Sequence, residues 1–308
     1  MIDNAVPARE RGTDDHFVHL SAVVETGLLC RELSRAAVSM FTRARRDRSR
    51  VDREYDGGYW SNVLQERRWE SCRSLEEFLN PAGDGWRLCK VDNRFVRARN
   101  SDYYRYRHRR LLQLLEQHTE PDSDLVEVGS GYGANLFGLA SSTRWRRLIG
   151  LELSETGIAA GRAIAAHFGL SDHIGFERAD LTNLSETARD VLSGRVVFSY
   201  YCFEQIPRDT EAAIRNLMAA GPRRVVHVEP VAELLRWYSP KDLVNYAHIL
   251  RHDYQRTLLR TLRQFQNRGE LRITDVRRLY YAPGLRHDPA LVAWEPVQRV
   301  NSGHRQAR

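Results

Sequence analysis

Lysine is nearly absent from this sequence of 308 residues, which contains only Lys90 and Lys241. Arginine therefore carries the basic charge, and 47 basic against 40 acidic side chains leave a formal net charge of +7. The arginines are scattered along the chain, although they are dense from 43 to 53 and from 94 to 110. Solvated helix faces are the simplest interpretation of such stretches, and contact with a polyanion is the alternative.

Cysteine is also scarce, and the four cysteines form neither a C-x-x-C pair nor any other metal-binding spacing. This argues against a disulfide framework and against structural zinc, and indicates a reducing compartment. No apolar run approaches the eighteen residues of a membrane span, and the N-terminus lacks the apolar stretch of a signal peptide. We therefore expect a cytoplasmic protein that makes no membrane contact.

The composition, with 42% hydrophobic and 28% charged residues, is that of a globular protein. Residues 1–18 are polar and are expected to form a disordered or loosely attached tail. Residues 19–100 are predicted to be a helical N-terminal extension that forms a lid. Within it, helices are expected between residues 20 and 50, at 61–69 and at 75–79, and residues 86–96 read as a short strand or a loop.

From residue 101 to 308 we expect one domain in which short apolar runs alternate with helical stretches. That alternation predicts an α/β fold with a doubly wound, mostly parallel, seven-stranded sheet. An antiparallel C-terminal hairpin should close the sheet, after a helical insertion at 231–268 with one long helix from about Lys241 to Arg268. The seven predicted strands are 125–128, 148–151, 174–176, 196–198, 225–228, 271–281 and 290–298.

Three glycines follow the first strand of this domain, in the order Gly129, Gly131 and Gly133. Glycines let a backbone approach a ligand closely, and the helix that begins here offers free N–H groups. The spacing G-x-G-x-G departs from the G-x-G-x-x-G of dinucleotide enzymes. Glu152 ends the second strand nineteen residues later, where a carboxylate can accept hydrogen bonds from both hydroxyls of a ribose, and Asp180 follows the third strand.

This combination resembles the class I, Rossmann-like S-adenosylmethionine-dependent methyltransferases over about residues 101–298. The whole pattern, with Tyr59-Trp60 and the helix that carries Tyr103 and Tyr104, is similar to bacterial sugar O-methyltransferases. The resemblance implies S-adenosyl-L-methionine as cofactor, with the glycines beside its methionine and ribose, Glu152 on the ribose, and Asp180 with Leu181 at the adenine. The full set of cofactor-binding candidates is Glu127, Gly129, Gly131, Tyr132, Gly133, Glu152, Leu153, Asp180, Leu181 and Tyr200.

The acceptor of the methyl group must lose a proton if it is a hydroxyl, so a general base is expected. The segment after the fourth strand looks like the one in which many small-molecule members carry Glu-His before a hydrophobic residue and proline. Here Gln205 replaces the histidine, and glutamine cannot take a proton. Two carboxylates at the carboxyl ends of strands stay open as the base, Glu204 and Glu229, whereas His227 is expected to pack inside the sheet.

The favoured function is methyl transfer, by in-line displacement, to a small-molecule or saccharide acceptor, with O-methylation preferred. An RNA or other nucleic-acid methyltransferase that uses the arginine-rich N-terminal helices is the alternative. A non-enzymatic scaffold and a nicotinamide oxidoreductase are disfavoured by the intact glycines and by their spacing. His248 and His252 lie one helical turn apart, but such pairs usually bind nothing, so no metal is expected. The oligomeric state is not indicated.

Overall fold

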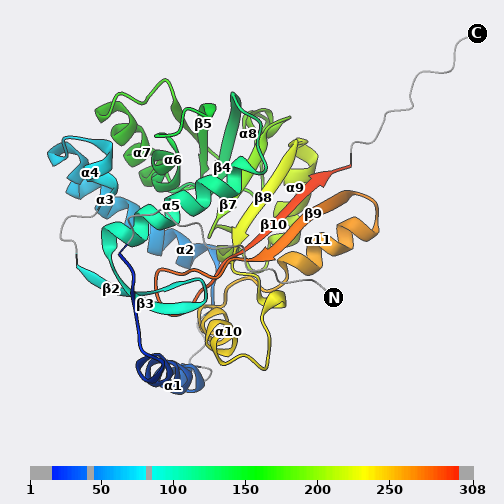
Figure 1. Ribbon diagram of the computed structural model, residues 1–308. Coiled ribbons are helices and arrows are strands. Elements are labelled where there is room, and N and C mark those ends of the chain that lie inside the picture. Colours follow the sequence, from blue (N-terminus) through cyan, green and yellow to red (C-terminus); the bar gives the residue numbers. More distant parts are fainter. Residues whose placement is uncertain (1–15, 40–44, 81–84, 298–308) are drawn as a thin grey trace, which may run out of the picture.

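A seven-stranded sheet forms the centre of the computed structural model, which describes residues 16–39, 45–80 and 85–297. Its strands are β4 (Ser123–Val128), β5 (Trp145–Glu152), β6 (Ile174–Arg178), β7 (Val196–Tyr200), β8 (Arg224–Glu229), β9 (Leu271–Arg278) and β10 (Ala290–Pro296). They lie in the order β6-β5-β4-β7-β8-β10-β9 (Figure 1). The first five strands along the chain pair in parallel, and β10 is antiparallel to both β8 and β9. The predicted α/β, doubly wound sheet with an antiparallel C-terminal hairpin is confirmed.

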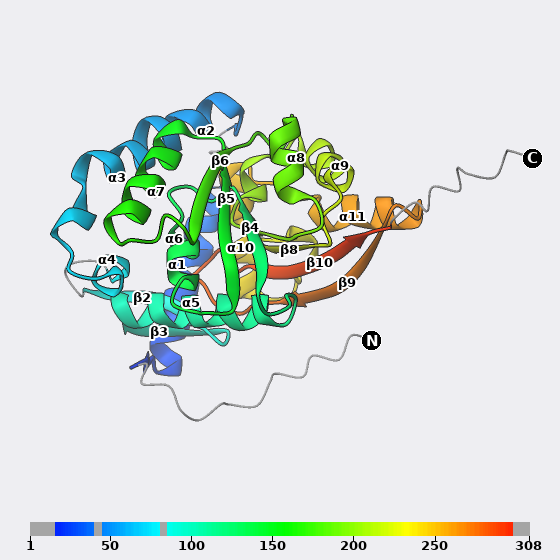
Figure 2. The ribbon, with the colours of Figure 1, turned by 90° about the horizontal axis from the view of Figure 1, so that it is seen from above.

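Helices cover both faces of this sheet, and its strands are therefore apolar on both sides. Leu125 and Val126 of β4 illustrate the alternation, because each belongs to a different one of the two buried clusters. Figure 2 shows the two helical layers on either side of the sheet. One layer holds α5 (Asn100–Glu116), α6 (Ala134–Leu139) and α7 (Glu155–His167), and the other α8 (Glu186–Leu192), α9 (Thr210–Ala220) and α11 (Leu258–Asn267).

The strand order reverses between β4 and β7. From β4 the chain proceeds outward through β5 and β6, and then returns to the centre to continue through β7 and β8 on the other side. The connections that leave β4 and β7 consequently run to opposite sides of the sheet, and a crevice opens beyond their carboxyl ends. The fold thus fixes where a ligand site is expected.

The N-terminal region contains helices and a small sheet. The helices are α1 (Ala22–Ser39), α2 (Arg48–Glu54), a π-helical turn (Tyr55–Trp60), α3 (Ser61–Glu66), a 3-10 turn (Arg68–Ser71) and α4 (Leu75–Leu79). Residues 86–96, for which the sequence allowed either a strand or a loop, belong to a hairpin of two strands, β2 (Trp86–Val91) and β3 (Arg94–Arg99). A short strand, β1 (Val18–His19), pairs with β3, so the expected loose tail does not reach residue 18. Residues 1–15 lie outside the described ranges.

The single long helix predicted from Lys241 to Arg268 is wrong, because the segment forms α10 (Pro240–His252) and α11. Asp253 ends α10 in a left-handed conformation with φ of 52°. Its carboxylate then accepts hydrogen bonds from Arg46 N and from Arg208. Throughout the ranges that the structure describes, no helix combines the length and apolar character needed to cross a bilayer.

The two lysines both join the β2–β3 hairpin to the C-terminal part of the chain. Lys90 is fully buried, and its Nζ lies 2.9 Å from the carboxylate of Asp288 in the β9–β10 connection. Lys241 of α10 pairs with Glu25 of α1 at 2.5 Å and donates to the carbonyl oxygen of Asn93 at the hairpin turn. The small sheet is thereby fixed against the loop that follows β9.

Candidate functional site

The loop after β4 requires glycine at two positions. The φ angle is 70° at Gly129 and 56° at Gly131, a region that favours glycine. Space is equally limiting, because a Cβ at Gly129 would lie 2.2 Å from Sγ of Cys202, and one at Gly131 would lie 2.6 Å from Cζ2 of Trp60. The loop is therefore packed between the end of β7 and the N-terminal region, and its backbone faces the crevice without side chains at these positions.

Glu152, the last residue of β5, binds this loop directly. Its Oε2 accepts a hydrogen bond from Gly131 N at 2.7 Å, and its Oε1 accepts from Leu153 N and Ser154 N at 2.9 Å each. Burial raises the pKa of Glu152, although these three N–H groups oppose the shift. A carboxylate has about four acceptor positions, so one remains open for a further donor.

Asp180 lies on the far side of Glu152, two residues beyond β6. Its Oδ1 accepts from the backbone N and the hydroxyl of Thr182, and its Oδ2 lies 2.7 Å from Nη1 of Arg48 in α2. Burial opposes ionisation, but these donors outweigh it and lower the pKa of Asp180. The carboxylate is therefore charged and fixed in place.

The segment from Arg48 to Trp60 closes this side of the crevice. Asp56 holds it against the start of α7, because Asp56 Oδ1 accepts from the hydroxyls of Ser154 and Thr156 at 2.5 and 2.9 Å. Trp60 packs edge-on against Tyr132 of the glycine loop, with ring centroids 5.5 Å apart. Part of the predicted lid thus lies directly over the glycine loop.

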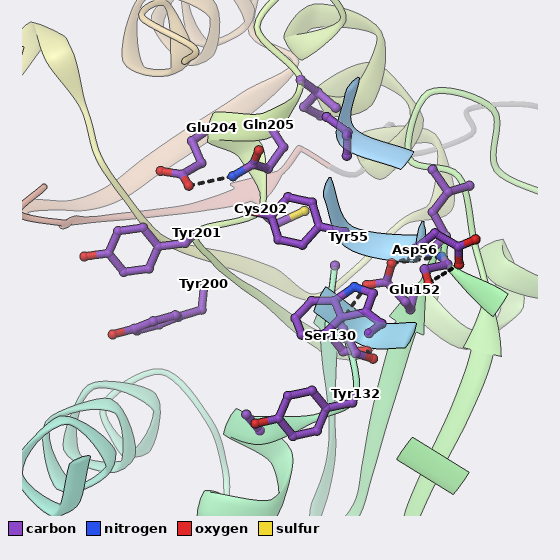
Figure 3. A pocket seen from close by; sticks show the side chains of 18 of the residues that line it. Tyr55, Asp56, Ser130, Tyr132, Glu152, Tyr200, Tyr201, Cys202, Glu204 and Gln205 are labelled. Atoms are coloured by element: carbon purple, nitrogen blue, oxygen red, sulfur yellow. Dashed lines mark hydrogen bonds between the residues drawn. The ribbon is translucent and has the colours of Figure 1, made fainter. Parts of the chain in front are cut away.

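These elements enclose a cavity of about 750 Å³ at the reversal point of the sheet. Figure 3 shows Glu152 and Asp56 on one side of it, Tyr200 and Tyr201 on the opposite side, and Glu204 beside Gln205. The aromatic residues Tyr55, Trp60, Tyr103 and Tyr104 also line it, whereas Tyr59 does not. The predicted site residues that line the cavity are Gly129, Gly131, Tyr132, Glu152, Leu153, Asp180, Leu181, Tyr200 and Glu204.

Three predicted site residues do not line the cavity. Gly133 begins α6 behind the loop, where a Cβ would lie 2.6 Å from the ring of Phe176. Glu127 is buried in the sheet and accepts a hydrogen bond from Asn135 Nδ2 at 2.6 Å. Both therefore support the loop from behind, and their contact with a cofactor stays a prediction.

Glu229 is the third, and it ends β8 as expected. It has no exposed surface, and its Oε1 accepts hydrogen bonds from Ser199 Oγ, Cys202 N and Phe203 N at 2.7, 2.9 and 3.1 Å. Burial, followed by the neighbouring charge of Glu204, raises the pKa of Glu229 to about 8. Glu229 consequently shapes the turn after β7 from inside the core.

Glu204 has a partner that sequence reasoning missed. Its Oε2 lies 2.5 Å from Nε2 of His287, a cavity-lining residue of the β9–β10 connection, and its Oε1 accepts from Gln205 Nε2 at 2.7 Å. The His287 ring stacks on Tyr254, with centroids 5.3 Å apart and planes at 15°. A carboxylate that accepts from Nε2 leaves the lone pair of a neutral imidazole on Nδ1. The sequence offered no local signal, because the two residues are 83 positions apart.

The loop that carries His287 is held by residues of two other elements. Asn245 of α10 accepts hydrogen bonds through Oδ1 from the backbone N of His287 and of Asp288. Its Nδ2 donates to the carboxylate of Asp288, which also binds the buried Lys90. The insertion and the hairpin thus position the imidazole at the cavity wall.

Comparisons with known proteins find no matching family and no curated relative for this sequence. Among solved structures, magnesium protoporphyrin IX methyltransferase from Synechocystis, with bound SAM, is similar, with 13% identity, a TM-score of 0.44, and coverage of 64% of this chain and 81% of that one. Fibrillarin from Aeropyrum pernix, with natively bound S-adenosyl-L-methionine, has 15% identity, a TM-score of 0.41 and coverage of 71% and 86%. An N-methyltransferase from Bradyrhizobium japonicum has 16% identity, a TM-score of 0.42 and coverage of 64% and 97%.

Numbered along the chain from β4, the strands of the large sheet lie in the order 3-2-1-4-5-7-6, with the last strand inserted antiparallel. The glycine loop follows strand 1, and the carboxylate that binds it ends strand 2. In its topology and in the placement of these groups, the chain has the Rossmann-like fold of the class I methyltransferases.

Proposed function

We propose that this protein is an S-adenosylmethionine-dependent methyltransferase that acts on a hydroxyl group of a small molecule or saccharide. One observation carries the proposal: the glycine loop and the Glu152 carboxylate are joined at 2.7 Å on the wall of a cavity of about 750 Å³. A cavity of this volume is within the range of small-ligand sites, and it lies where doubly wound sheets bind ligands.

The residues present fit the cofactor. Glu152 has one acceptor position open for a ribose hydroxyl, and it gains a second if Gly131 N releases it. Asp180 and Leu181 line the same end of the cavity, where a carboxylate oxygen can accept from the adenine amino group. The bare backbone of the glycine loop leaves room for the rest of the molecule.

S-adenosylmethionine would supply a methyl group on a positively charged sulfur, and that charge is lost on transfer. The protein's own part is to orient the two reactants, exclude water and take the proton of the acceptor. Glu204 and His287 suit the last task, because Glu204 fixes Nε2–H of His287 and leaves Nδ1 to accept a proton. Glu229 does not suit it, because it is buried behind the turn.

A small acceptor is favoured over a nucleic acid by the use of the N-terminal arginines. Arg46 is buried and pairs with Glu54, Arg48 pairs with Asp180, and Arg50 pairs with Glu54. In the described part of the 43–53 stretch, these three arginines thus pair with carboxylates of the protein itself, which supports a role in closing the cavity. A nucleic-acid surface would instead need arginines that are free to bind phosphates. Tyr201, Tyr254 and His287 also make the wall around the base largely aromatic, as suits a planar or ring-shaped acceptor.

Calorimetry with S-adenosylmethionine and with S-adenosylhomocysteine tests the proposal. We expect micromolar-range binding, and we expect Glu152→Ala to weaken it by about 1.5 to 3 kcal/mol through the loss of charge-assisted hydrogen bonds. Glu186→Ala is the matched control, since Glu186 is exposed at the start of α8 and does not line the cavity. Absence of binding to the unaltered protein, or equal affinities for both variants, would overturn the assignment. A methyl-donor assay across sugars, aromatic metabolites, peptides and tRNA would then identify the acceptor.

A further inference from the structure

The connection between β9 and β10 is bound to the N-terminal region on both sides of His287. Arg286 lies 3.3 Å from the carboxylate of Glu32 in α1, and Asp288 lies 2.9 Å from Nζ of Lys90 in β2. Figure 1 shows this connection passing beside β2 and β3. Two elements of the N-terminal region thus each bind one neighbour of the residue that carries the imidazole.

The ion pair of Lys90 and Asp288 is enclosed, with side chains that are 0% and 3% exposed. The carboxylate of Asp288 also accepts from Nδ2 of Asn245 at 3.1 Å, and Oδ1 of Asn245 accepts from the backbone N of His287. The backbone of Lys90 bonds to that of Ala282 in both directions, at 3.0 and 3.1 Å. Lys90 therefore fixes the connection through its main chain and through its side chain.

Stability alone does not account for a buried ion pair at this place. Removing two charges from water costs free energy that their attraction regains only in part, and an apolar pair of similar volume often stabilises a core equally well. A fully bonded polar network instead makes one arrangement of the surrounding chain more rigid. His287 has a φ of 81°, in the left-handed region, and a side chain of this kind keeps such a backbone only where its surroundings enforce it.

The remaining bonds of His287 reach the cavity wall. Its carbonyl oxygen accepts from the hydroxyl of Tyr201 at 2.8 Å, and its Nε2 lies 2.5 Å from Oε2 of Glu204. Both partners line the cavity, as Figure 3 shows. The backbone on both sides of the ring and the ring itself are thus fixed together, so a shift of the connection would move Nδ1 relative to a bound acceptor.

We propose that Lys90 is a positioning residue for methyl transfer, which acts through Asp288 to hold the imidazole of His287 where it takes the acceptor's proton. The inference rests on the function proposed above. In that step the acceptor oxygen bonds to the methyl carbon as the carbon–sulfur bond breaks, the sulfur keeps the electron pair, and the proton passes to Nδ1. Lys90 itself does not line the cavity. The small sheet of the N-terminal region therefore braces the base from outside the parallel-sheet domain.

The test removes both charges together in the double variant Lys90→Met/Asp288→Asn, so that no lone charge stays buried. We expect the long-range proton–nitrogen NMR spectrum of His287 to change from one tautomer, with the proton on Nε2, to a mixture. The affinity for S-adenosylhomocysteine, measured by calorimetry, should change less than about 2-fold, because the cofactor lies at the other end of the cavity. With an acceptor found by the assay named above, kcat should fall about 10- to 100-fold at a nearly constant KM.

Lys241→Met is the matched control. It removes the only other lysine, which binds Glu25 and the carbonyl oxygen of Asn93 at the hairpin turn, and it should leave the His287 spectrum and kcat unchanged. An unchanged His287 spectrum or a full kcat in the double variant would overturn the proposal, and so would an equal change in the control.

A loss of S-adenosylhomocysteine affinity in the double variant would also overturn the proposal, because it would indicate a general disturbance of the fold. If the unaltered protein does not bind S-adenosylhomocysteine, the proposed function fails, and the part of Lys90 in methyl transfer fails with it. The NMR comparison separately shows whether Lys90 orients His287, so the two failures are distinguishable.

Discussion

Tyr201 and His287 hold each other at the cavity wall, where the Tyr201 hydroxyl donates to the carbonyl oxygen of His287 at 2.8 Å. Their φ angles are 56° and 81°, and no other non-glycine residue of the described cavity lining has a positive φ. A left-handed backbone at such residues costs about 1 to 3 kcal/mol each. The chain thus gives up stability to keep one imidazole in a fixed position beside Glu204.

Glu204 should determine the tautomer of His287. In the unaltered protein, long-range proton–nitrogen NMR spectra should place the proton of the neutral His287 ring on Nε2, with the signal assigned by its loss in His287→Gln. In Glu204→Leu, which cannot accept a hydrogen bond, we expect a mixture of tautomers or the Nδ1–H form. His173, which bonds the carbonyl oxygen of Arg146, is the internal control and should not change. An unchanged His287 signal in Glu204→Leu would show that Glu204 does not orient the ring.

Gly131→Ala should destabilise the protein more than Gly169→Ala. Both positions have positive φ, 56° and 68°, so both variants lose about 1 to 2 kcal/mol through backbone strain. A Cβ at Gly169 meets nothing within 4 Å, whereas one at Gly131 meets Trp60 and should cost a further 1 to 3 kcal/mol, as is roughly typical of overpacking. Urea unfolding measures the difference between the two variants. Equal free energies of unfolding would mean that Trp60 does not press on the loop.

Asp56→Ala should loosen the segment that covers the cavity. The change removes the hydrogen bonds to Ser154 and Thr156, and should lower the free energy of unfolding by about 1 to 2 kcal/mol. Trypsin should then cleave more rapidly among the arginines from 45 to 53. Asp52→Ala, which alters an exposed carboxylate one turn earlier, is the control. If both variants are cleaved at the rate of the unaltered protein, Asp56 does not tether the segment.

The same carboxylate predicts a dependence on pH. The hydrogen bond from Ser154 and those from Thr156 lower the pKa of Asp56 below its usual 3.8, against the effect of burial. Its contribution to stability is therefore present above pH 3.8 and is lost as the pH falls through the lower value of the folded state. The stabilities of Asp56→Ala and of the unaltered protein should converge in acid.

Glu229→Gln should make the protein more stable in mildly alkaline solution. Burial raises the pKa of Glu229 to about 8 from its usual 4.5, so between these values the unfolded chain releases a proton that the folded chain keeps. The stability contributed by this group is full below pH 4.5 and declines as the pH rises toward 8, by at most about 1.4 kcal/mol per pH unit. Glutamine keeps the acceptor for Cys202 N and removes the titration. The gain in the free energy of unfolding, measured with urea at several pH values, should vanish near pH 4.5. The control variant Glu155→Gln, which changes an exposed carboxylate, should show no such gain.

The parallel strands and the glycine loop could be predicted from the sequence because their signals are local. Leu125, Val126 and Val128 give the strand apolar side chains on both faces, and the glycine loop follows directly. The break between α10 and α11 escaped prediction because apolar residues keep the helical period on both sides of it. Asp253 bends the chain there, and its contact with Arg46 spans 207 positions.

The functional side chains that were missed depend on tertiary structure alone. His287 lies in a connection between two strands, and only folding brings it to Glu204. Arg107 lines the cavity, but nothing in the sequence distinguishes it from Arg105 on the same helix, which pairs with Asp102 instead. Glu229 shows the converse, since its place at a strand end made it a candidate base, but the turn after β7 folds over it.

The position of β10 between β8 and β9 has a consequence for the newly made chain. β9 is synthesised first but bonds to the sheet only through β10, so a nascent chain that has reached Arg278 has five parallel strands and an unpaired β8. Exposed strand edges of this kind pair readily with other chains. Until Trp294 and its neighbours emerge from the ribosome and fill the gap, the growing polypeptide is at its most vulnerable to aggregation, and a holdase chaperone would protect it best during that interval.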